Sequence, residues 1–331
     1  MEVKDVVGID VSKLENEARV HSSQEVLTFD NNIKGFKKLI SWVSNKSKLD
    51  TKQILFAFEH TGLYSFPLSL FLAENNYSYV LLPGLELKRS MGITRGKNDK
   101  IDAKRIAKYT FEKRESIKPY EMPIEEVLQI KRLLTLRDRL VRQRAGYKAS
   151  LGEYKHFLIK NDNTVLFDTQ ENMIKHMSKQ VVRVEKELYK IILGNDNLKK
   201  MYDLIISIKG VGPQTALFLI AYTNGFTRFA TWRKFASYCG IAPFPYQSGT
   251  SIWGRTKVNN LANKKIKSLL DLCAKSSIQF NMEMKIYYEK RTEEGKSKMG
   301  TINIIRNKIL SRIFAVVQRG TPYVDTLGYA A

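Results

Sequence analysis

Apolar residues in the first 120 positions form short runs that alternate with stretches of helical spacing. Runs of β-branched and aromatic residues predict strands, whereas apolar side chains three and four apart predict helices. Residues 54–58 are apolar throughout, which is typical of a strand buried on both faces. The predicted order is strands at 6–9, 18–22 and 26–29, a helix over 32–43, the strand at 54–58, a helix over 62–74 kinked at Pro67, and a strand at 79–82. The first domain, residues 1–120, is therefore an α/β domain with a mixed sheet.

The rest of the chain is predicted to be mainly helical. Residues 127–157 contain no proline and carry apolar side chains alternately three and four apart, so they predict a helix of about 30 residues and about 45 Å. A second helix over 171–193 follows the polar break at 161–163. The pair predicts a helical coiled-coil arm over 121–195, although its polar a and d positions leave a plain core helix as the alternative. The polar stretch 195–197 then marks the start of an all-α domain over 196–331.

The charge balance predicts a polyanionic partner. The 331 residues include 55 Lys and Arg against 33 Asp and Glu, a formal net charge of +22. Residues 1–87 carry nine basic and eleven acidic side chains, so the whole surplus lies after them. Nucleic acid is the commonest partner of such a chain, and a solvated Lys-rich surface is the alternative. A hydrophobic content of 43% excludes wholesale disorder.

The sequence also predicts a cytoplasmic protein. No apolar run approaches the length that spans a bilayer, and the N-terminus lacks the apolar core of a secretory signal. The two cysteines, Cys239 and Cys273, cannot form a disulfide framework and lack the spacing of a zinc site.

Four carboxylates in the first third of the chain are candidate metal ligands. Asp10 and Glu59 each lie at the end of a predicted strand, and Asp99 and Asp102 lie three apart at a predicted helix start. Convergence of the four would create repulsion that a pair of Mg²⁺ or Mn²⁺ ions could neutralise, and such ions activate phosphate chemistry. Singly, each has an ordinary structural explanation as a turn former, a surface residue or a helix cap. The phosphate loop of actin-like kinases is excluded, because Val11-Ser12-Lys13 lacks its Gly and Thr.

Basic residues crowd the segment that contains two of these carboxylates. A solvated helix face normally alternates its signs, so this cluster is expected to hold a nucleic-acid backbone against the metal site. The residues concerned are Arg95, Lys97, Lys100, Lys104 and Arg105.

Two motifs near the C-terminus are further candidates for phosphate contact. The stretch 205–216 fits a helix-hairpin-helix signature, in which Gly210 and Gly212, next to Lys209, let backbone amides approach a phosphate. The alternative is a tight corner between two helices. The stretch 238–255 places Ser248 in an exposed, non-helical segment close to two cations that could hold an anion, Arg255 and Lys257. From residue types alone this segment is only a loop.

Taken together, these motifs resemble those of the DEDD transposases of bacterial insertion sequences, which are related to the pilin-gene invertase and guided by a bridge RNA. The resemblance covers nearly the whole chain, and its pieces occur in family order. They are Gly8-Ile-Asp-Val-Ser-Lys13, Glu59-His-Thr-Gly62, Asp99-Lys-Ile-Asp-Ala103, Ile208-Lys-Gly-Val-Gly-Pro213, Gly240-Ile-Ala-Pro243, Gln247-Ser-Gly249, Gly254-Arg255 and Arg306-Asn-Lys-Ile-Leu310.

The resemblance implies a fold and a chemistry. It implies a ribonuclease-H-like (RuvC-like) first domain, a helical arm and a C-terminal transposase domain. Asp10, Glu59, Asp99 and Asp102 match the metal-binding tetrad. Ser248, with Ser251 as the alternative, matches the serine that attacks the phosphodiester and leaves a 3′-hydroxyl. The serine of one protomer is expected to work with the carboxylates of another, so a dimer or tetramer is implied.

The resulting hypothesis is RNA-guided DNA recombination that depends on Mg²⁺ or Mn²⁺, with donor DNA, target DNA and a guide RNA as partners. Base pairing to the RNA would choose the sites, and the protein would hold the backbone. The alternative is a junction-resolving nuclease in which the tetrad activates water. A nucleic-acid-binding protein without catalysis is the third possibility.

Overall fold

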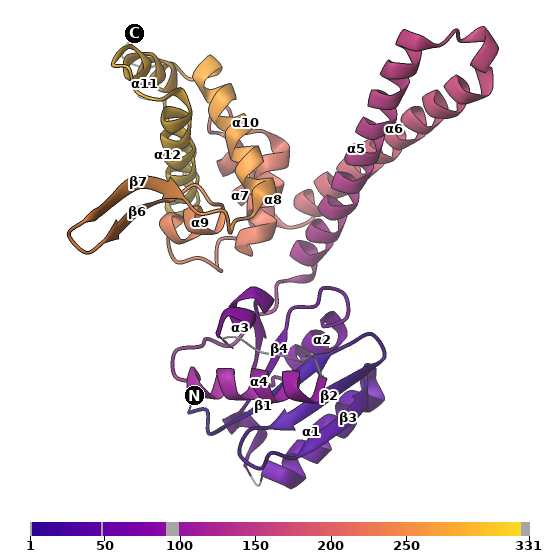
Figure 1. Cartoon of the computed structure of the whole chain (residues 1–331), viewed down its shortest axis with the longest axis vertical. Coiled ribbons are helices and arrows are strands. Elements are labelled where there is room, and N and C mark those ends of the chain that lie inside the picture. Colours follow the sequence, from indigo (N-terminus) through magenta and orange to yellow (C-terminus); the bar gives the residue numbers. More distant parts are fainter. Residues whose placement is uncertain (1, 48, 91–98, 326–331) are drawn as a thin grey trace. The chain divides into compact units, whose positions relative to one another are not determined.

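The computed structural model describes residues 2–47, 49–90 and 99–325, without the side chains of Asp99, Lys100, Ser248 and Ile252. The chain divides into two compact units, Met1–Met122 and Pro123–Ala331. Each unit has its own hydrophobic core, and the elements are labelled in Figure 1.

The first unit is built on a mixed five-stranded sheet with the strand order β3-β2-β1-β4-β5. Its first three strands are antiparallel neighbours, whereas β1, β4 and β5 run parallel to one another. The bounds are β1 Asp5–Val11, β2 Glu15–Val20, β3 Val26–Asp30, β4 Ile54–Glu59 and β5 Tyr79–Leu82. The predicted mixed sheet is confirmed, and its topology is consistent with a ribonuclease-H-like fold.

Helices cover both faces of this sheet. The bounds are α1 Ile33–Ser47, α2 Phe66–Glu74, α3 Gly84–Ser90 and α4 Asp99–Glu112, with a short 3₁₀ turn at Thr51–Gln53. Phe36 and Leu39 of α1 pack with Phe56 and Phe58 on one face. Leu55 and Ala57 of β4 point to the other face, where they pack with Ile106 of α4.

One predicted detail of this unit is wrong. Residues 62–74 do not form a single helix kinked at Pro67; α2 begins at Phe66, and Pro67 lies in its first turn. A proline is tolerated there, because the N–H that it lacks would have had no partner inside the helix.

The second unit begins with two long antiparallel helices. They are α5, Glu125–Phe157, and α6, Thr164–Leu193, joined through a 3₁₀ turn at Asn161–Asn163. α5 has 33 residues and therefore extends about 50 Å. Their proximal halves are part of the core of the unit, since Ile130 and Leu188 are fully buried in the same cluster as the C-terminal helices. The division of this unit into an arm and a separate domain stays a prediction.

The C-terminal part of this unit is mainly helical, as predicted, but it also contains a β-hairpin. The helices are α7 Asp196–Ile206, α8 Pro213–Thr223, α9 Trp232–Tyr238, α10 Lys264–Phe280, α11 Met282–Glu293 and α12 Lys298–Arg319. The hairpin strands are β6 Pro243–Ser248 and β7 Ile252–Val258, and they extend away from the helices (Figure 1). Cys239 and Cys273 are buried free thiols in this core.

No helix within the described parts of the chain is long and apolar enough to cross a membrane.

Candidate functional site

Asp10 and Glu59 lie on the two central parallel strands, β1 and β4. Ile9 is registered with Phe58, so the two acidic residues that follow them occupy the same level of the sheet. Side chains alternate along a strand, and the strands place Ile9 and Phe58 in the core on the α1 side. Asp10 and Glu59 therefore belong to the opposite face, which α4 covers, and both are partly buried.

Helix α4 approaches this face closely because β1 carries a glycine. A Cβ atom on Gly8 would lie 2.4 Å from the carbonyl oxygen of Ala103 and 2.3 Å from the backbone nitrogen of Ala107. Only a residue without a side chain allows this contact. It holds the turn of α4 that contains Asp102 directly on the strand that contains Asp10.

Glu59 depends on a second glycine in the same way. A Cβ atom on Gly84, the first residue of α3, would lie 1.9 Å from the Glu59 Oε1 atom. The carboxylate therefore occupies the space that a side chain at position 84 would fill. The sequence does not identify Gly8 and Gly84 as site residues, because it does not show which element packs against each glycine.

The two members of the predicted tetrad on α4 differ in how far the structure describes them. Asp102 forms an ion pair with Arg105 at 3.0 Å, and its side chain keeps 26% of its surface exposed. Asp99 is the first residue of α4, and its side chain lies outside the described part. Among the described residues, no group of three or more His, Cys, Asp or Glu side chains is positioned to hold a metal ion. The tetrad therefore stays a prediction, with two members on one sheet face and the other two on the helix that covers it.

The donor chemistry nevertheless suits a divalent cation. Carboxylate oxygens are the ligands that Mg²⁺ and Mn²⁺ prefer, and Gly84 leaves room for the Glu59 carboxylate. The sequence predicts Asp10, Glu59, Asp99 and Asp102 as the residues that would hold such an ion.

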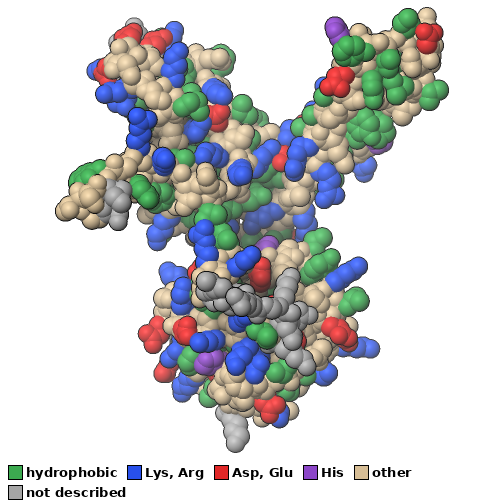
Figure 2. Space-filling view, viewed as in Figure 1, with side chains coloured by type: hydrophobic (Ala, Val, Ile, Leu, Met, Phe, Trp, Pro, Cys, Tyr) green, Lys and Arg blue, Asp and Glu red, His purple; other side chains and the backbone are tan. Residues whose placement is uncertain are grey.

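The predicted basic cluster is described only in part. Arg95 and Lys97 lie outside the described residues, as does the side chain of Lys100. Lys104 is exposed on α4, whereas Arg105 is occupied by Asp102. On the face seen in Figure 2, Lys and Arg side chains occur on both units.

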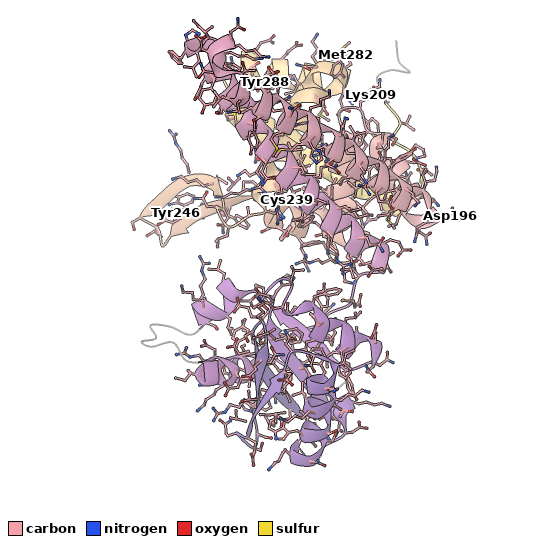
Figure 3. All side chains as sticks on the ribbon, turned by 90° about the vertical axis from the view of Figure 1, so that its right-hand side faces the viewer. Asp196, Lys209, Cys239, Tyr246, Met282 and Tyr288 are labelled. Carbon is pink, nitrogen blue, oxygen red and sulfur yellow. The ribbon has the colours of Figure 1, made fainter. Side chains whose placement is uncertain are left out.

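The predicted helix-hairpin-helix stretch forms α7, a turn and α8, but its two glycines differ in their surroundings. Gly210 has φ +96°, and a Cβ atom there would lie 2.1 Å from the Oγ atom of Ser277 on α10. Gly212 is exposed, and a Cβ atom on it would have no neighbour within 4 Å. Gly210 therefore allows α10 to pack closely against the turn, whereas the backbone at Gly212 is accessible to a ligand. Lys209, labelled in Figure 3, forms an ion pair with Asp325 at 3.2 Å.

The predicted serine segment is the β6–β7 hairpin rather than a loop. Ser248 is the last residue of β6 and is registered with Ile252, the first of β7. Gly249 follows in the left-handed region with φ +56°, where glycine is favoured. Ser251 is exposed in the turn, and Arg255 and Lys257 are exposed on β7.

The electrostatics of this region favour an anion. The chain contains no Asp or Glu between Asp203 and Asp271, whereas it carries nine Lys and Arg residues there. The charge pattern of this region therefore suits a phosphate group.

Comparison with known proteins accounts for both units. Residues 7–154 match the model of a DEDD transposase family of IS110 elements, described as "Transposase". Residues 202–289 match a second model, described as "Transposase IS116/IS110/IS902 family". The first match contains all four carboxylates, and the second contains the hairpin.

Individual proteins show the same similarity, two of them over almost their whole length. The chain is 24% identical to the pilin gene-inverting proteins of Moraxella bovis and Moraxella lacunata, over 97% of this chain and 98% of each relative. It is 30% identical over 120 residues to an uncharacterized 43.6 kDa protein of insertion element IS110 from Streptomyces coelicolor, over 36% of this chain and 29% of that protein.

Proposed function

Because residues 7–154 and 202–289 match transposase models of IS110 elements, we propose that the chain is a transposase of this kind and that it cuts and rejoins DNA through a phosphoserine intermediate. Ser248 is the proposed nucleophile. Enzymes of the DEDD type typically use a divalent metal, and the proposed ligands are Asp10, Glu59, Asp99 and Asp102. The observation that supports the metal site of this proposal is the common sheet face of Asp10 and Glu59, on which α4 packs through Gly8.

The proposed chemistry is two successive transesterifications. The Ser248 hydroxyl oxygen forms a bond to the scissile phosphorus, the bond from phosphorus to the 3′-oxygen breaks, and the serine proton ends on the departing 3′-hydroxyl. A 3′-hydroxyl oxygen from the second duplex then forms a bond to this phosphorus, the bond from phosphorus to the serine oxygen breaks, and the proton of the attacking hydroxyl ends on the serine. A serine hydroxyl needs activation, and a bound divalent ion would supply it by stabilising charge on the phosphate.

The basic segments would hold the nucleic-acid backbone. This is supported by the exposure of Lys104, Arg255 and Lys257 and by the open space around Gly212, next to the backbone amides at the start of α8. A structured guide RNA would select donor and target by base pairing. The hairpin and the tetrad are on separate units, which is compatible with a serine that acts in trans in a dimer or tetramer. The two free buried thiols agree with a cytoplasmic protein.

Trapping the covalent intermediate tests the proposal. Protein, guide RNA and Mg²⁺ are incubated with a nicked suicide DNA whose short leaving fragment diffuses away. The wild-type protein is expected to form a covalent adduct, and Ser248→Ala is expected to form none. Ser251→Ala is the matched control, because it removes a hydroxyl from the same hairpin turn and is expected to keep the adduct.

Two outcomes would contradict the proposal. An unchanged adduct with Ser248→Ala would refute the serine assignment. Nicked products without any adduct or strand exchange would instead support a junction-resolving nuclease. Loss of adduct in Asp10→Asn with retained DNA binding would separate catalysis from binding alone.

A further inference from the structure

The β6–β7 hairpin presents two large aromatic side chains to solvent. Tyr246 is 66% exposed and Trp253 is 74% exposed. Such exposure of rings is unfavourable in water, so a pair of them on one short element calls for an explanation. Tyr246 is labelled on the hairpin in Figure 3.

The two rings belong to opposite faces of the ribbon. Tyr246 is registered with Gly254, and Gln247 with Trp253. Since successive residues of a strand point to opposite faces, Trp253 lies on the face opposite to Tyr246.

Each ring is held in place by its own contact. The Tyr246 ring lies across Gly254, where an added Cβ atom would be 2.6 Å from the Tyr246 Cδ1 atom. The Trp253 Nε1 atom donates a hydrogen bond to the carbonyl oxygen of Thr250 at 3.2 Å. Rings fixed before a ligand arrives lose little conformational freedom on binding.

The charge around the rings indicates the chemistry of the ligand. Arg255 and Lys257 are exposed on the same hairpin, and the nearest acidic residues along the chain are Asp203 and Asp271. Flat rings beside cations, without carboxylates nearby along the chain, are the combination that binds unpaired nucleic acid, because bases stack on rings while phosphates pair with cations.

We propose that Tyr246 and Trp253 stack on unpaired nucleobases of the DNA strand that the hairpin engages. The hairpin would thus act as an aromatic wedge that holds opened bases on both of its faces. The inference rests on the proposed function in taking DNA as the ligand, but base stacking requires neither the serine nor a metal ion.

Binding of single-stranded DNA without divalent metal tests this inference. The probe is an oligonucleotide that carries a fluorescent purine analogue, added to the full-length protein in the presence of EDTA. Tyr246→Leu and Trp253→Leu are each expected to weaken binding by about 10- to 100-fold, since stacking on one aromatic side chain has about that effect. Tyr246→Phe and Trp253→Phe retain a ring and are expected to bind within about threefold of the wild type.

A control variant and the salt dependence of binding separate base stacking from attraction between charges. Phe157→Leu removes a ring that is 79% exposed at the end of α5 and is expected to bind like the wild type. The Leu variants of the hairpin are expected to keep the salt dependence of binding, whereas Arg255→Gln reduces it. Equal affinity of the Leu variants and the wild type, or equal losses in the Phe and Leu variants, would overturn the inference.

Trp253 fluorescence provides an independent readout. The other two tryptophans, Trp42 and Trp232, are partly buried against the cores, so the difference in emission between wild type and Trp253→Phe reports the hairpin. DNA is expected to quench this difference signal. A change with protein concentration alone, without DNA, would mean that a second copy of the chain covers the ring and would overturn the inference. Ser248→Ala should lose the covalent adduct yet keep the quenching, so the two proposals fail separately.

Discussion

The substitution Gly8→Ala tests whether the contact between α4 and β1 assembles the carboxylate face. The new Cβ atom would lie 2.3 Å from the Ala107 nitrogen and 2.4 Å from the Ala103 oxygen, whereas ordinary contact begins at 3.4 Å. Both obstructing atoms are backbone atoms, so they cannot rotate away. Helix α4 must therefore move outward by about 1 Å, and overpacking of this kind destabilises by about 1–3 kcal/mol or more.

The displacement also predicts a loss of activity beyond the loss of stability. Asp99 and Asp102 are carried by α4, so the shift separates them from the strand residues Asp10 and Glu59. A misplacement of about 1 Å in a catalytic group can reduce the rate by about 100-fold. We expect strand cleavage per folded molecule to fall by that order.

Urea unfolding and cleavage measured on the same samples check both effects. With Trp232 and Trp253 replaced by phenylalanine in all samples, Trp42, which packs against the core of the first unit, reports the unfolding of that unit alone. Gly146→Ala is the matched control, because α5 leaves open space around Gly146 and alanine there should stabilise the helix by about 0.5–1 kcal/mol. A Gly8→Ala protein with wild-type stability and wild-type cleavage would refute the described contact.

Three further predictions address other parts of the chain. Gly84→Ala would place a Cβ atom 1.9 Å from the Glu59 Oε1 atom. Because the Glu59 side chain can rotate away, we expect about 100-fold slower cleavage with little change in melting temperature. A large fall in melting temperature that accounts for the lost cleavage would contradict this. Burial and the neighbouring Arg228 lower the pKa of Lys131 to about 8, from 10.5. The unfolded chain therefore binds more protons between these pH values, and stability rises with pH through that window. Lys131→Met should accordingly be more stable than wild type by about 2 kcal/mol at pH 7. Urea unfolding should show that this difference in the free energy of unfolding shrinks towards pH 10. A difference that stays constant with pH would show that titration of Lys131 does not cause it. Finally, Asn195 caps α7 by accepting a hydrogen bond from the Leu198 nitrogen at 3.2 Å, so Asn195→Ala should reduce the free energy of unfolding by about 1 kcal/mol, and an unchanged urea midpoint would count against the cap.

The sheet was predictable because its signal is local. Residues of β4 from Ile54 to Phe58 are all fully buried, and burial on both faces requires an uninterrupted apolar run. The position of Asp10 and Glu59 at the same height along the neighbouring strands β1 and β4 could be predicted too, since each carboxylate directly follows an apolar run.

The hairpin was not predictable as a pair of strands, because its signal is not local. Pro243 and Pro245 cannot donate ladder hydrogen bonds, and Gly249 and Gly254 are typical of turns. Contact across the ribbon, such as that of Tyr246 over Gly254, stabilises strands that have weak propensity on their own. The roles of Gly8 and Gly84 could not be predicted for the same reason. Each glycine allows a distant part of the chain to come close, and the sequence does not show which part this is.

The state of the two thiols makes the protein well suited to spectroscopic labelling. Burial raises the pKa of both Cys239 and Cys273, so these sulfurs remain protonated and out of reach of maleimide reagents. A cysteine introduced on the surface would therefore react selectively, with no need to remove the native ones. A fluorophore attached to such a cysteine would report changes in its own surroundings when DNA is added to the protein.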